Sequence, residues 1–392
     1  MTAPVLTAEE AGATCRPLDE ARYLPGRVYH DEEIYAAEVE RIFLREWVAV
    51  FAAAKLASVG NYTTMDLAGK PLVFVRDTSG AVRCYINVCR HRGNEVAEGS
   101  GNAGFFRCGY HRWTYDLDGE VTHAPLMPEF ANCGVRLTEV RTEVWQGIVF
   151  VNFDRDAAGL GSRLGRIDAA LRPWRADELV MMYERPYQCD WNWKIMFENG
   201  IESYHILGTH RASIEASVPA KISYGDPGDG ENYSESHYPY ANETPTGSDA
   251  DALYLHPEDA GIPPIADLPG WASEKLVFWA VYPNLILNQR VDGLQAYITL
   301  PHGPRESTFT WFYLTHPSAT ASPGYDKFRH SEEGFADLIQ EEDERCTRPV
   351  QKSMESGEYI PGPYNQRELP IWALHQWWVH RMVDNAPTTG RW

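Results

Sequence analysis

The spacing of apolar and polar residues divides the chain into a strand-rich part and a mixed part. Between residues 45 and 155, short apolar runs such as residues 71–76 and 147–153 are separated by Gly and Asp turns, which is typical of small antiparallel sheets. After residue 156, helical patterns alternate with strand patterns. We therefore predict an α+β fold of two domains. A small antiparallel β domain covers residues 45–155, and an antiparallel sheet covered by helices is built from residues 1–44 and 156–392.

Helical periodicity is clearest at two places in the second domain. Glu198, Glu202 and His205 follow one another at four and three residues, which would place them on one face of a helix. Gly208 would end or bend this helix. A longer helix is predicted from an apolar stripe that recurs at about 100° per residue and contains Phe335, Ile339, Cys346 and Val350.

Three further segments have a predicted local structure. Residues 369–382 are predicted to form a helix packed on the second domain, and helical signals at residues 31–47 should pack on the same domain. The Gly-, Pro- and Ser-rich residues 224–251 are predicted to form a surface loop.

Composition and charge restrict the class of protein. With 392 residues, of which 44% are apolar, the chain is long enough for two globular cores. The net charge of -20 argues against nucleic acid and anionic membranes as partners, because both attract basic surfaces. The amino terminus has no long apolar run, and the seven Cys show no paired spacing of a disulfide framework. These features predict a cytoplasmic enzyme.

Two short motifs bring Cys and His together in the first domain. One residue separates Cys89 from His91, and two residues separate Cys108 from His111. Thiolates suit iron and inorganic sulfide, while two neutral imidazoles on one iron raise the reduction potential of a cluster. The pattern indicates a Rieske [2Fe-2S] centre between two loops. A tetrahedral zinc site is the alternative, although zinc motifs usually group Cys with Cys and His with His.

His205 and His210 are candidates for a second metal site. Two neutral imidazoles and one carboxylate form the facial triad of non-haem Fe(II) oxygenases, but two His five residues apart are more often ordinary structural residues. The carboxylate would come from the acidic run at residues 341–344. The apolar periodicity points Glu342 toward the core rather better than Asp343.

The residues around both motifs resemble the Rieske non-haem iron oxygenases, and in particular the terminal oxygenase (alpha) subunits of the aromatic-ring-hydroxylating dioxygenase family. The first stretch is Cys89-Arg-His91-Arg-Gly93 with Cys108-Gly-Tyr-His111-Arg-Trp113. The second, residues 191–210, contains Asn-Trp-Lys, Glu-Asn, an acidic residue, Tyr-His and a second His in that order.

The resemblance implies a role for each candidate residue. The [2Fe-2S] cluster ligands would be Cys89, His91, Cys108 and His111. A mononuclear Fe(II) would be bound by His205, His210 and Asp343, since the family pattern of Glu-Asp, Cys and Val-Gln selects Asp343 and leaves Glu342 in reserve. Glu202 would be the acidic bridge between His111 of one subunit and His205 of its neighbour. Many ring dioxygenases have Asp there, and relatives resembling carnitine and betaine oxygenases have Glu.

The resemblance further implies the reaction and the partners. Electrons would come from a separate NAD(P)H-dependent reductase, directly or through a ferredoxin. The Gly-rich residues 159–165 are one residue longer than the dinucleotide-binding fingerprint, so we do not expect them to bind a nicotinamide cofactor. The enzyme would use O2 to hydroxylate or oxidatively demethylate a small organic substrate. A homotrimer would bring each cluster close to a neighbour's iron.

Two other functions and the choice of substrate stay open on the sequence. A Rieske-type electron carrier without oxygenase activity would need the first motif alone, and a zinc-stabilised binding module would need neither iron centre. Aromatic compounds and quaternary ammonium compounds are both candidate substrates, and the abundant aromatic residues could form a cation-binding cage.

Overall fold

The computed structural model describes residues 5–241, 257–384 and 386. The chain forms two compact units, one from residues 43–162 and one from residues 1–42 together with 163–392. The predicted first domain, residues 45–155, lies within the first of these ranges.

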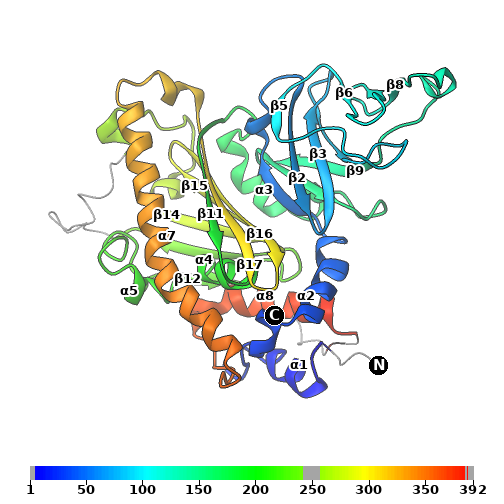
Figure 1. The fold of residues 1–392 in the computed structure, drawn as a ribbon. Coiled ribbons are helices and arrows are strands. Elements are labelled where there is room, and N and C mark those ends of the chain that lie inside the picture. Colours follow the sequence, from blue (N-terminus) through cyan, green and yellow to red (C-terminus); the bar gives the residue numbers. More distant parts are fainter. Residues whose placement is uncertain (1–4, 242–256, 385, 387–392) are drawn as a thin grey trace. The chain divides into compact units, whose positions relative to one another are not determined.

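The unit of residues 43–162 contains one large and one small antiparallel sheet (Figure 1). The large sheet has the strand order β1-β10-β9-β4-β3-β2-β5, and the small sheet has the order β6-β7-β8. Their shared core includes Tyr85, Phe106, Trp113 and Tyr115. The strands are β1 (Val48–Ala52), β2 (Asn61–Leu67), β3 (Lys70–Arg76), β4 (Val82–Ile86), β5 (Ser100–Asn102), β6 (Phe106–Arg107), β7 (Thr114–Tyr115), β8 (Val121–His123), β9 (Glu139–Trp145) and β10 (Ile148–Asn152).

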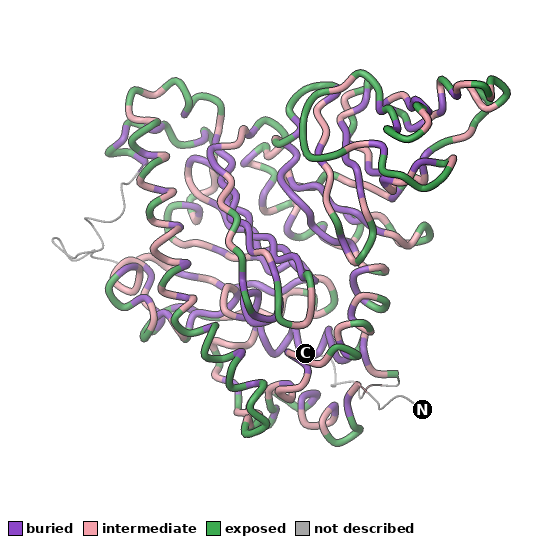
Figure 2. Tube along the Cα trace, viewed as in Figure 1, coloured by how far each residue is buried: buried purple, intermediate pink, exposed green. Residues whose placement is uncertain are grey.

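The other unit contains a seven-stranded antiparallel sheet with the order β11-β17-β16-β15-β14-β13-β12. Figure 2 shows that its central strands are buried over most of their length, which agrees with their nearly continuous apolar runs. The strands are β11 (Val180–Cys189), β12 (Tyr224–Asp226), β13 (Tyr233–Pro239), β14 (Lys275–Val281), β15 (Leu285–Arg290), β16 (Gly293–Gly303) and β17 (Glu306–Thr315).

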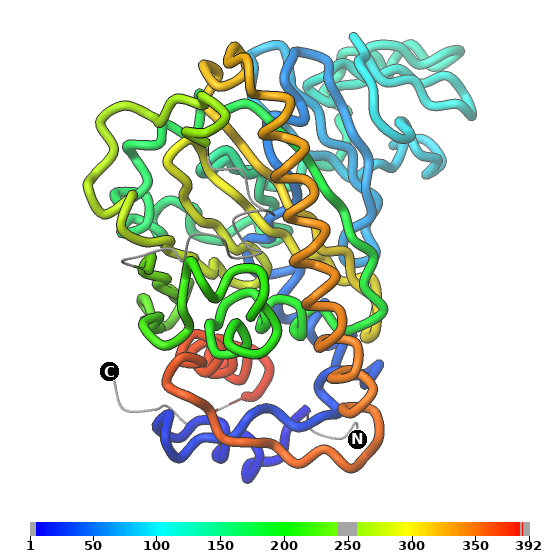
Figure 3. The backbone as a smooth tube through the Cα atoms, turned by 90° about the vertical axis from the view of Figure 1, so that its left-hand side faces the viewer, coloured from blue at the N-terminus to red at the C-terminus, as the bar shows by residue number. Residues whose placement is uncertain are grey.

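Helices cover this sheet, as the sequence predicts for an α+β fold. The 31-residue helix α7 runs along one face (Figures 1 and 3). It packs Phe328 against Tyr313, and its Asp337 accepts a hydrogen bond from Tyr187 of β11 at 2.8 Å. The helices are α1 (Ala8–Thr14), α2 (Glu32–Glu38), α3 (Gly165–Leu171), α4 (Trp193–Gly200), α5 (Ile206–Thr209), α7 (Tyr325–Glu355) and α8 (Leu369–Met382). The predicted helix at residues 369–382 is confirmed.

Helices α2, α4 and α8 meet at the fully buried carboxylate of Glu38. Glu38 accepts hydrogen bonds from Lys194 at 2.6 Å, Trp193 at 3.0 Å and Trp378 at 2.7 Å. A buried charge is tolerated only when such partners satisfy it. The contact confirms this packing for α2, which lies in the predicted helical segment of residues 31–47, whereas residues from 43 onward belong to the other unit.

The predicted helix that carries Glu198, Glu202 and His205 on one face is wrong. Helix α4 ends at Gly200, so Glu202 lies beyond it. The hydroxyl groups of Ser236 and Tyr238 on β13 donate hydrogen bonds to the carbonyls of residues 201 and 202, which replaces the partners that a continued helix would supply.

The predicted surface loop at residues 224–251 is also wrong in its first part. Strand β13 occupies residues 233–239 and pairs with β14, and β12 occupies residues 224–226 and pairs with β13 as the edge strand of the sheet. The rest of the predicted loop, from residue 242, lies outside the described residues.

Candidate metal centres and substrate cavity

Two loops of the unit of residues 43–162 place the Cys and His of the first motif together. Cys89 and His91 follow β4, and Cys108 and His111 lie between β6 and β7. The thiols of Cys89 and Cys108 are buried and within hydrogen-bonding distance of each other. The ring centroids of His91 and His111 lie 4.4 Å apart, and both rings are partly exposed. The two sulfurs therefore lie on the buried side and the two imidazoles on the solvent side.

Donors to sulfur surround this group. The Tyr115 hydroxyl lies 3.1 Å from Cys89 Sγ, and Trp113 stacks on His91 with 5.3 Å between ring centroids. Burial raises the pKa of the Cys108 thiol, but backbone N–H groups of Tyr110 and His111 hydrogen-bond to it, and its pKa is below the usual value. Aligned N–H and O–H donors stabilise the anionic sulfurs of an iron–sulfur cluster.

A single zinc ion fits this motif less well than a two-iron cluster. In the described part of the chain, the group of His, Cys, Asp and Glu close enough to share one ion consists of His205, His210 and Asp343. The four residues of the first motif are not in such a group, as expected for ligands that bind two separate irons.

His205, His210 and Asp343 converge between the short helix α5 and the long helix α7. The Nε2 atoms of His210 and His205 lie 3.0 Å and 3.7 Å from Asp343 Oδ1, and the three ligand atoms all lie within 4.8 Å of one another. Adjacent ligands in octahedral coordination with bonds of about 2.1 Å are roughly 3 Å apart. The donor set therefore fits a mononuclear iron that keeps other positions open.

Each imidazole contacts a second carboxylate through Nδ1, the ring nitrogen on the side away from Asp343. Glu202 Oε1 lies 2.5 Å from His205 Nδ1, and Glu342 Oε2 lies 2.8 Å from His210 Nδ1. Each carboxylate can accept a hydrogen bond from Nδ1–H, which leaves Nε2 as the ring atom that would bind a metal.

The electrostatics of the site favour a cation. Burial alone would lower the pKa of His205, but the nearby carboxylates of Glu202 and Asp343 raise it to about 8. With Glu342, three carboxylates surround two imidazoles in a largely buried site. A divalent cation balances this negative charge.

The two adjacent carboxylates of α7 contact different atoms of the His pair. Asp343 is 6% exposed and lies toward Nε2 of both His residues, whereas Glu342 contacts Nδ1 of His210. The family pattern thus favours the carboxylate that faces the His pair, and the apolar periodicity favours its neighbour.

Sequence reasoning missed three polar contacts of this site. Asn199 donates a hydrogen bond to Asp343 Oδ1 at 3.2 Å, and the Ser213 hydroxyl donates to Glu342 Oε2 at 2.6 Å. The third is the contact of Glu342 with His210. Asn199 belongs to the Glu-Asn pair of the second motif, but no sequence signal links Ser213 to Glu342.

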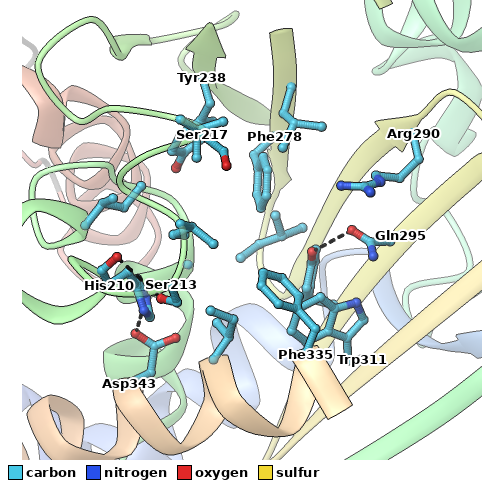
Figure 4. A pocket seen from close by; sticks show the side chains of 18 of the residues that line it. His210, Ser213, Ser217, Tyr238, Phe278, Arg290, Gln295, Trp311, Phe335 and Asp343 are labelled. Atoms are coloured by element: carbon cyan, nitrogen blue, oxygen red, sulfur yellow. Dashed lines mark hydrogen bonds and ion pairs between the residues drawn. The ribbon is translucent and has the colours of Figure 1, made fainter. Parts of the chain in front are cut away.

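A cavity of about 440 Å³ extends from the metal ligands between the sheet and helix α7. In Figure 4, His210 and Asp343 lie on one side of it and Arg290 and Gln295 on the other. Its walls between these ends are mostly apolar and aromatic, including Tyr238, Phe278, Phe309, Trp311 and Phe335. The volume suits a small organic molecule.

Comparison with known protein families agrees with both metal centres. A model described as the ring hydroxylating alpha subunit (catalytic domain) matches residues 176–384, and a Rieske [2Fe-2S] domain model matches residues 46–141. The chain belongs to this family of ring-hydroxylating alpha subunits. It is a terminal oxygenase with a Rieske cluster and a mononuclear iron, so the electron-carrier alternative is not favoured.

Relatives of this alpha subunit include both monooxygenases and dioxygenases. The chain is 26% identical over 389 residues to the glycine betaine monooxygenase oxygenase subunit of Chromohalobacter salexigens, covering 92% of this chain and 86% of that protein. It is 36% identical over 212 residues to the 2-aminobenzenesulfonate 2,3-dioxygenase subunit alpha of an Alcaligenes species, covering 52% of this chain and 53% of that one.

Solved structures of the same fold include enzymes of both kinds. A quaternary ammonium Rieske monooxygenase aligns with a TM-score of 0.77 and 20% identity over 96% of this chain and 99% of that one. A naphthalene 1,2-dioxygenase from a Rhodococcus species aligns with a TM-score of 0.74 and 20% identity over 93% and 95% of the two chains. These identities establish the fold alone.

The family sets the general partners of this alpha subunit. Its members are terminal oxygenases of multicomponent systems, which receive electrons from partner proteins and use O2 with a small substrate. Within the described residues, no helix is both long and apolar enough to cross a membrane.

Proposed function

We propose that this alpha subunit hydroxylates or oxidatively demethylates a small organic substrate, and that seven side chains hold its two metal centres. The cluster ligands are Cys89, His91, Cys108 and His111, and the iron ligands are His205, His210 and Asp343. The convergence of two imidazole Nε2 atoms on Asp343 Oδ1, with each Nδ1 held by a carboxylate, carries this proposal. When bound, ferrous iron in such a triad has positions available for O2 beside a substrate.

In this proposal the protein side chains orient the metal ligands and the substrate and exclude water, and they do not themselves react with the substrate. Glu202 and Glu342 hold the two imidazoles in the tautomer that binds metal. The apolar walls of the cavity hold a substrate next to the triad and keep bulk water away. Which carbon of the substrate lies nearest the triad decides between hydroxylation and demethylation.

We further propose that the enzyme is a homotrimer in which Glu202 links His111 of a neighbouring copy to His205. Exposed apolar side chains next to both centres support such an interface. Tyr110, beside His111, is 56% exposed, and Tyr204 and Leu207, on either side of His205, are 49% and 57% exposed. Large apolar side chains grouped at a functional site mark an interaction surface. A carboxylate between two imidazoles provides a short hydrogen-bonded route for electrons.

The electron donor in this proposal is a separate NAD(P)H-dependent reductase, acting directly or through a ferredoxin, in the cytoplasm. The acidic balance of the chain, with a net charge of -20, suits a partner whose docking face is basic. Screening by salt should then slow reduction of the cluster.

Iron content and coupled turnover test the proposal. We expect about three irons per chain, two in the cluster and one in the triad. With a surrogate reductase and a panel of aromatic acids and methylated amines, we expect O2 consumption, and we expect release of formaldehyde where a substrate is demethylated. His205→Ala should lose the third iron and turnover but keep the visible spectrum of the cluster. His302→Ala, at an exposed His of the same unit, is the matched control. Retention of the third iron and of turnover in His205→Ala would contradict the proposed ligands.

A further inference from the structure

The end of the cavity remote from the metal ligands is polar, in contrast to its walls. Arg290 at the end of β15, Gln295 on β16, Trp311 on β17 and Glu332 on α7 all line it. Figure 4 shows the side chains of Arg290 and Gln295 on the opposite side of the cavity from His210 and Asp343. Three consecutive strands and a helix therefore contribute to one polar site inside an otherwise apolar space.

Two buried polar atoms of this site have no hydrogen-bond partner. They are Glu332 Oε1, on a residue that is 1% exposed, and Trp311 Nε1, on a residue that is 5% exposed. An unsatisfied buried polar group is unfavourable by about 1–3 kcal/mol. Such groups on the wall of a cavity next to the metal ligands mark a place that a ligand would fill.

Arg290 is positioned to receive a charged group. The indole of Trp174 donates to the Arg290 carbonyl at 2.7 Å, which holds its backbone in place. The nearest Glu332 oxygen lies 3.9 Å from Arg290 Nη2, whereas charge-assisted hydrogen bonds are typically about 2.7–2.9 Å long. The planar guanidinium has five N–H groups, so it can bind an oxyanion in addition to its protein contacts.

The hydrogen bonds of Gln295 define the role of Glu332. The Gln295 amide oxygen accepts hydrogen bonds from Tyr297 at 3.2 Å and Asn288 at 3.3 Å, so its NH2 group faces Glu332 Oε2 at 3.4 Å. Burial raises the pKa of Glu332 to about 8, although Arg290 opposes this. The neutral acid would have one O–H donor, and Oε1, which has no hydrogen-bond partner and lies 3.9 Å from Arg290 Nη2, is the oxygen available for it.

A second acidic residue near Arg290 does not occupy this end of the cavity. Asp292 accepts a hydrogen bond from the Tyr313 hydroxyl at 2.7 Å and is not among the residues that line the cavity. Burial raises the pKa of Asp292 as well. The guanidinium of Arg290 thus carries the permanent positive charge at this end. Outside the metal site, Glu258 also lines the cavity, and this residue is exposed.

We infer that this polar end is an oxyanion subsite, and that the substrate of the proposed oxygenase carries a carboxylate or sulfonate on an apolar body. The anion pairs with Arg290 and accepts from Trp311 Nε1–H and Glu332, while the apolar body spans the aromatic walls toward the triad. A cationic head group would instead meet the permanent positive charge of Arg290 at this end. The inference rests on the proposed function, since it assigns the substrate class of the same cavity.

Binding of three probes of one shape tests the subsite in the full-length enzyme loaded with cluster and iron. The probes are benzenesulfonate, the neutral benzenesulfonamide and the cation phenyltrimethylammonium, and binding is followed by quenching of tryptophan fluorescence. We expect the sulfonate to bind at least about tenfold more tightly than the sulfonamide, and the cation to bind least. Equal binding of the three, no binding of the sulfonate, or tightest binding of the cation would overturn the subsite.

Variants test which residues cause the preference for the sulfonate over the sulfonamide. Arg290→Gln should reduce the preference for the sulfonate over the sulfonamide to about one, while Arg290→Lys should keep part of it because the charge remains without the planar fork. Glu332→Gln should keep or increase the preference, because it makes the neutral state permanent. Arg185→Gln, at a partly exposed Arg of β11 paired with Asp337, is the control and should change nothing. An unchanged preference in Arg290→Gln would overturn the role of Arg290.

Two measurements separate failure of the subsite from failure of the proposed function. Iron content and the cluster spectrum are recorded for every variant. If the wild type holds the third iron and couples O2 consumption to oxidation of a neutral or cationic substrate, the oxygenase proposal stands and the subsite falls. If it holds no third iron, the proposed function itself falls. Because the wild-type probe preference alone tests the charge of the subsite, an Arg290→Gln variant that fails to fold leaves the test intact.

Discussion

Replacement of Glu342 is the most direct test of the metal site, because this residue supports the triad without binding the metal. Glu342 Oε2 accepts hydrogen bonds from His210 Nδ1 at 2.8 Å and from the Ser213 hydroxyl at 2.6 Å. The His210 side chain is 2% exposed and that of Glu342 is 12% exposed. Glu342→Ala therefore leaves the His210 Nδ1–H without its charged acceptor in a site that is shielded from bulk solvent.

The size of the expected loss of Fe(II) affinity follows from the burial of His210 and Glu342. A buried donor left without its partner is destabilised by about 1–3 kcal/mol, and a partner with full charge lies toward the upper part of this range. Because His210 must keep Nδ1–H to present Nε2 to the metal, most of this free energy appears as weaker metal binding. We expect Fe(II) affinity to fall about 10- to 100-fold in Glu342→Ala. In Glu342→Gln the amide oxygen can still accept from His210, so the loss should be about tenfold or less.

Anaerobic titration of Fe(II) into protein with an intact cluster and an empty triad measures this affinity. Glu341→Ala is the matched control, since Glu341 is the preceding residue of α7 and pairs with exposed Arg345. Asp343→Ala should lose more affinity than Glu342→Ala, because it removes a ligand atom. Equal affinities of Glu342→Ala and Glu341→Ala would refute the supporting role, and a larger loss in Glu342→Ala than in Asp343→Ala would make Glu342 the ligand.

Three further predictions concern electron transfer, stability and pH. Glu202→Ala should keep both metal centres but lose nearly all coupled turnover, measured as product formed per O2 consumed; normal coupling would remove the bridge. Lys194→Met should lower the free energy of unfolding, measured in urea, by about 3–5 kcal/mol, because it leaves the Glu38 carboxylate buried without its cation. Lys221→Met, at an exposed Lys, is the control and should have no effect. A loss below about 1 kcal/mol in Lys194→Met would contradict this reasoning. Glu332 has a pKa of about 8 in the folded state and about 4.5 in the unfolded state, so the folded state binds an extra proton between these values. The contribution of Glu332 to stability is therefore present below pH 4.5 and is lost as pH rises toward 8, by at most about 1.4 kcal/mol per pH unit. Glu332→Gln should therefore gain stability relative to the wild type between pH 5 and pH 8 in thermal melts, and a constant difference would show that the carboxyl titrates normally.

Local sequence was sufficient for features whose residues lie close together along the chain. The cluster ligands come in two pairs, each within one loop, so their spacing alone indicates the chemistry. The predicted helix at residues 369–382 agrees with α8 because its signal lies within one uninterrupted segment. His205 and His210 are also near neighbours, and a five-residue spacing allows both rings to reach one point.

Features that depend on contacts between distant segments required the tertiary structure. Helix α4 ends at Gly200, hydroxyl groups from β13 hydrogen-bond to the carbonyls of the next two residues, and no pattern within the helix records those contacts. Asp343 and Glu342 are adjacent on α7, about 100° apart around its axis, and only packing against Asn199 and His210 decides which of them faces the metal site. Such choices depend on long-range packing, which overrides local preference.

The polar end of the cavity shows the same division most clearly. Its residues come from β15, β16, β17 and α7, and each would pass for an ordinary buried or surface residue in its own segment. The sequence by itself determined the family, the cofactors and the candidate metal ligands, since metal chemistry needs particular residue types at short spacings. Only the tertiary structure decided what lies opposite the candidate metal ligands, because that surface forms where consecutive strands pack against helix α7.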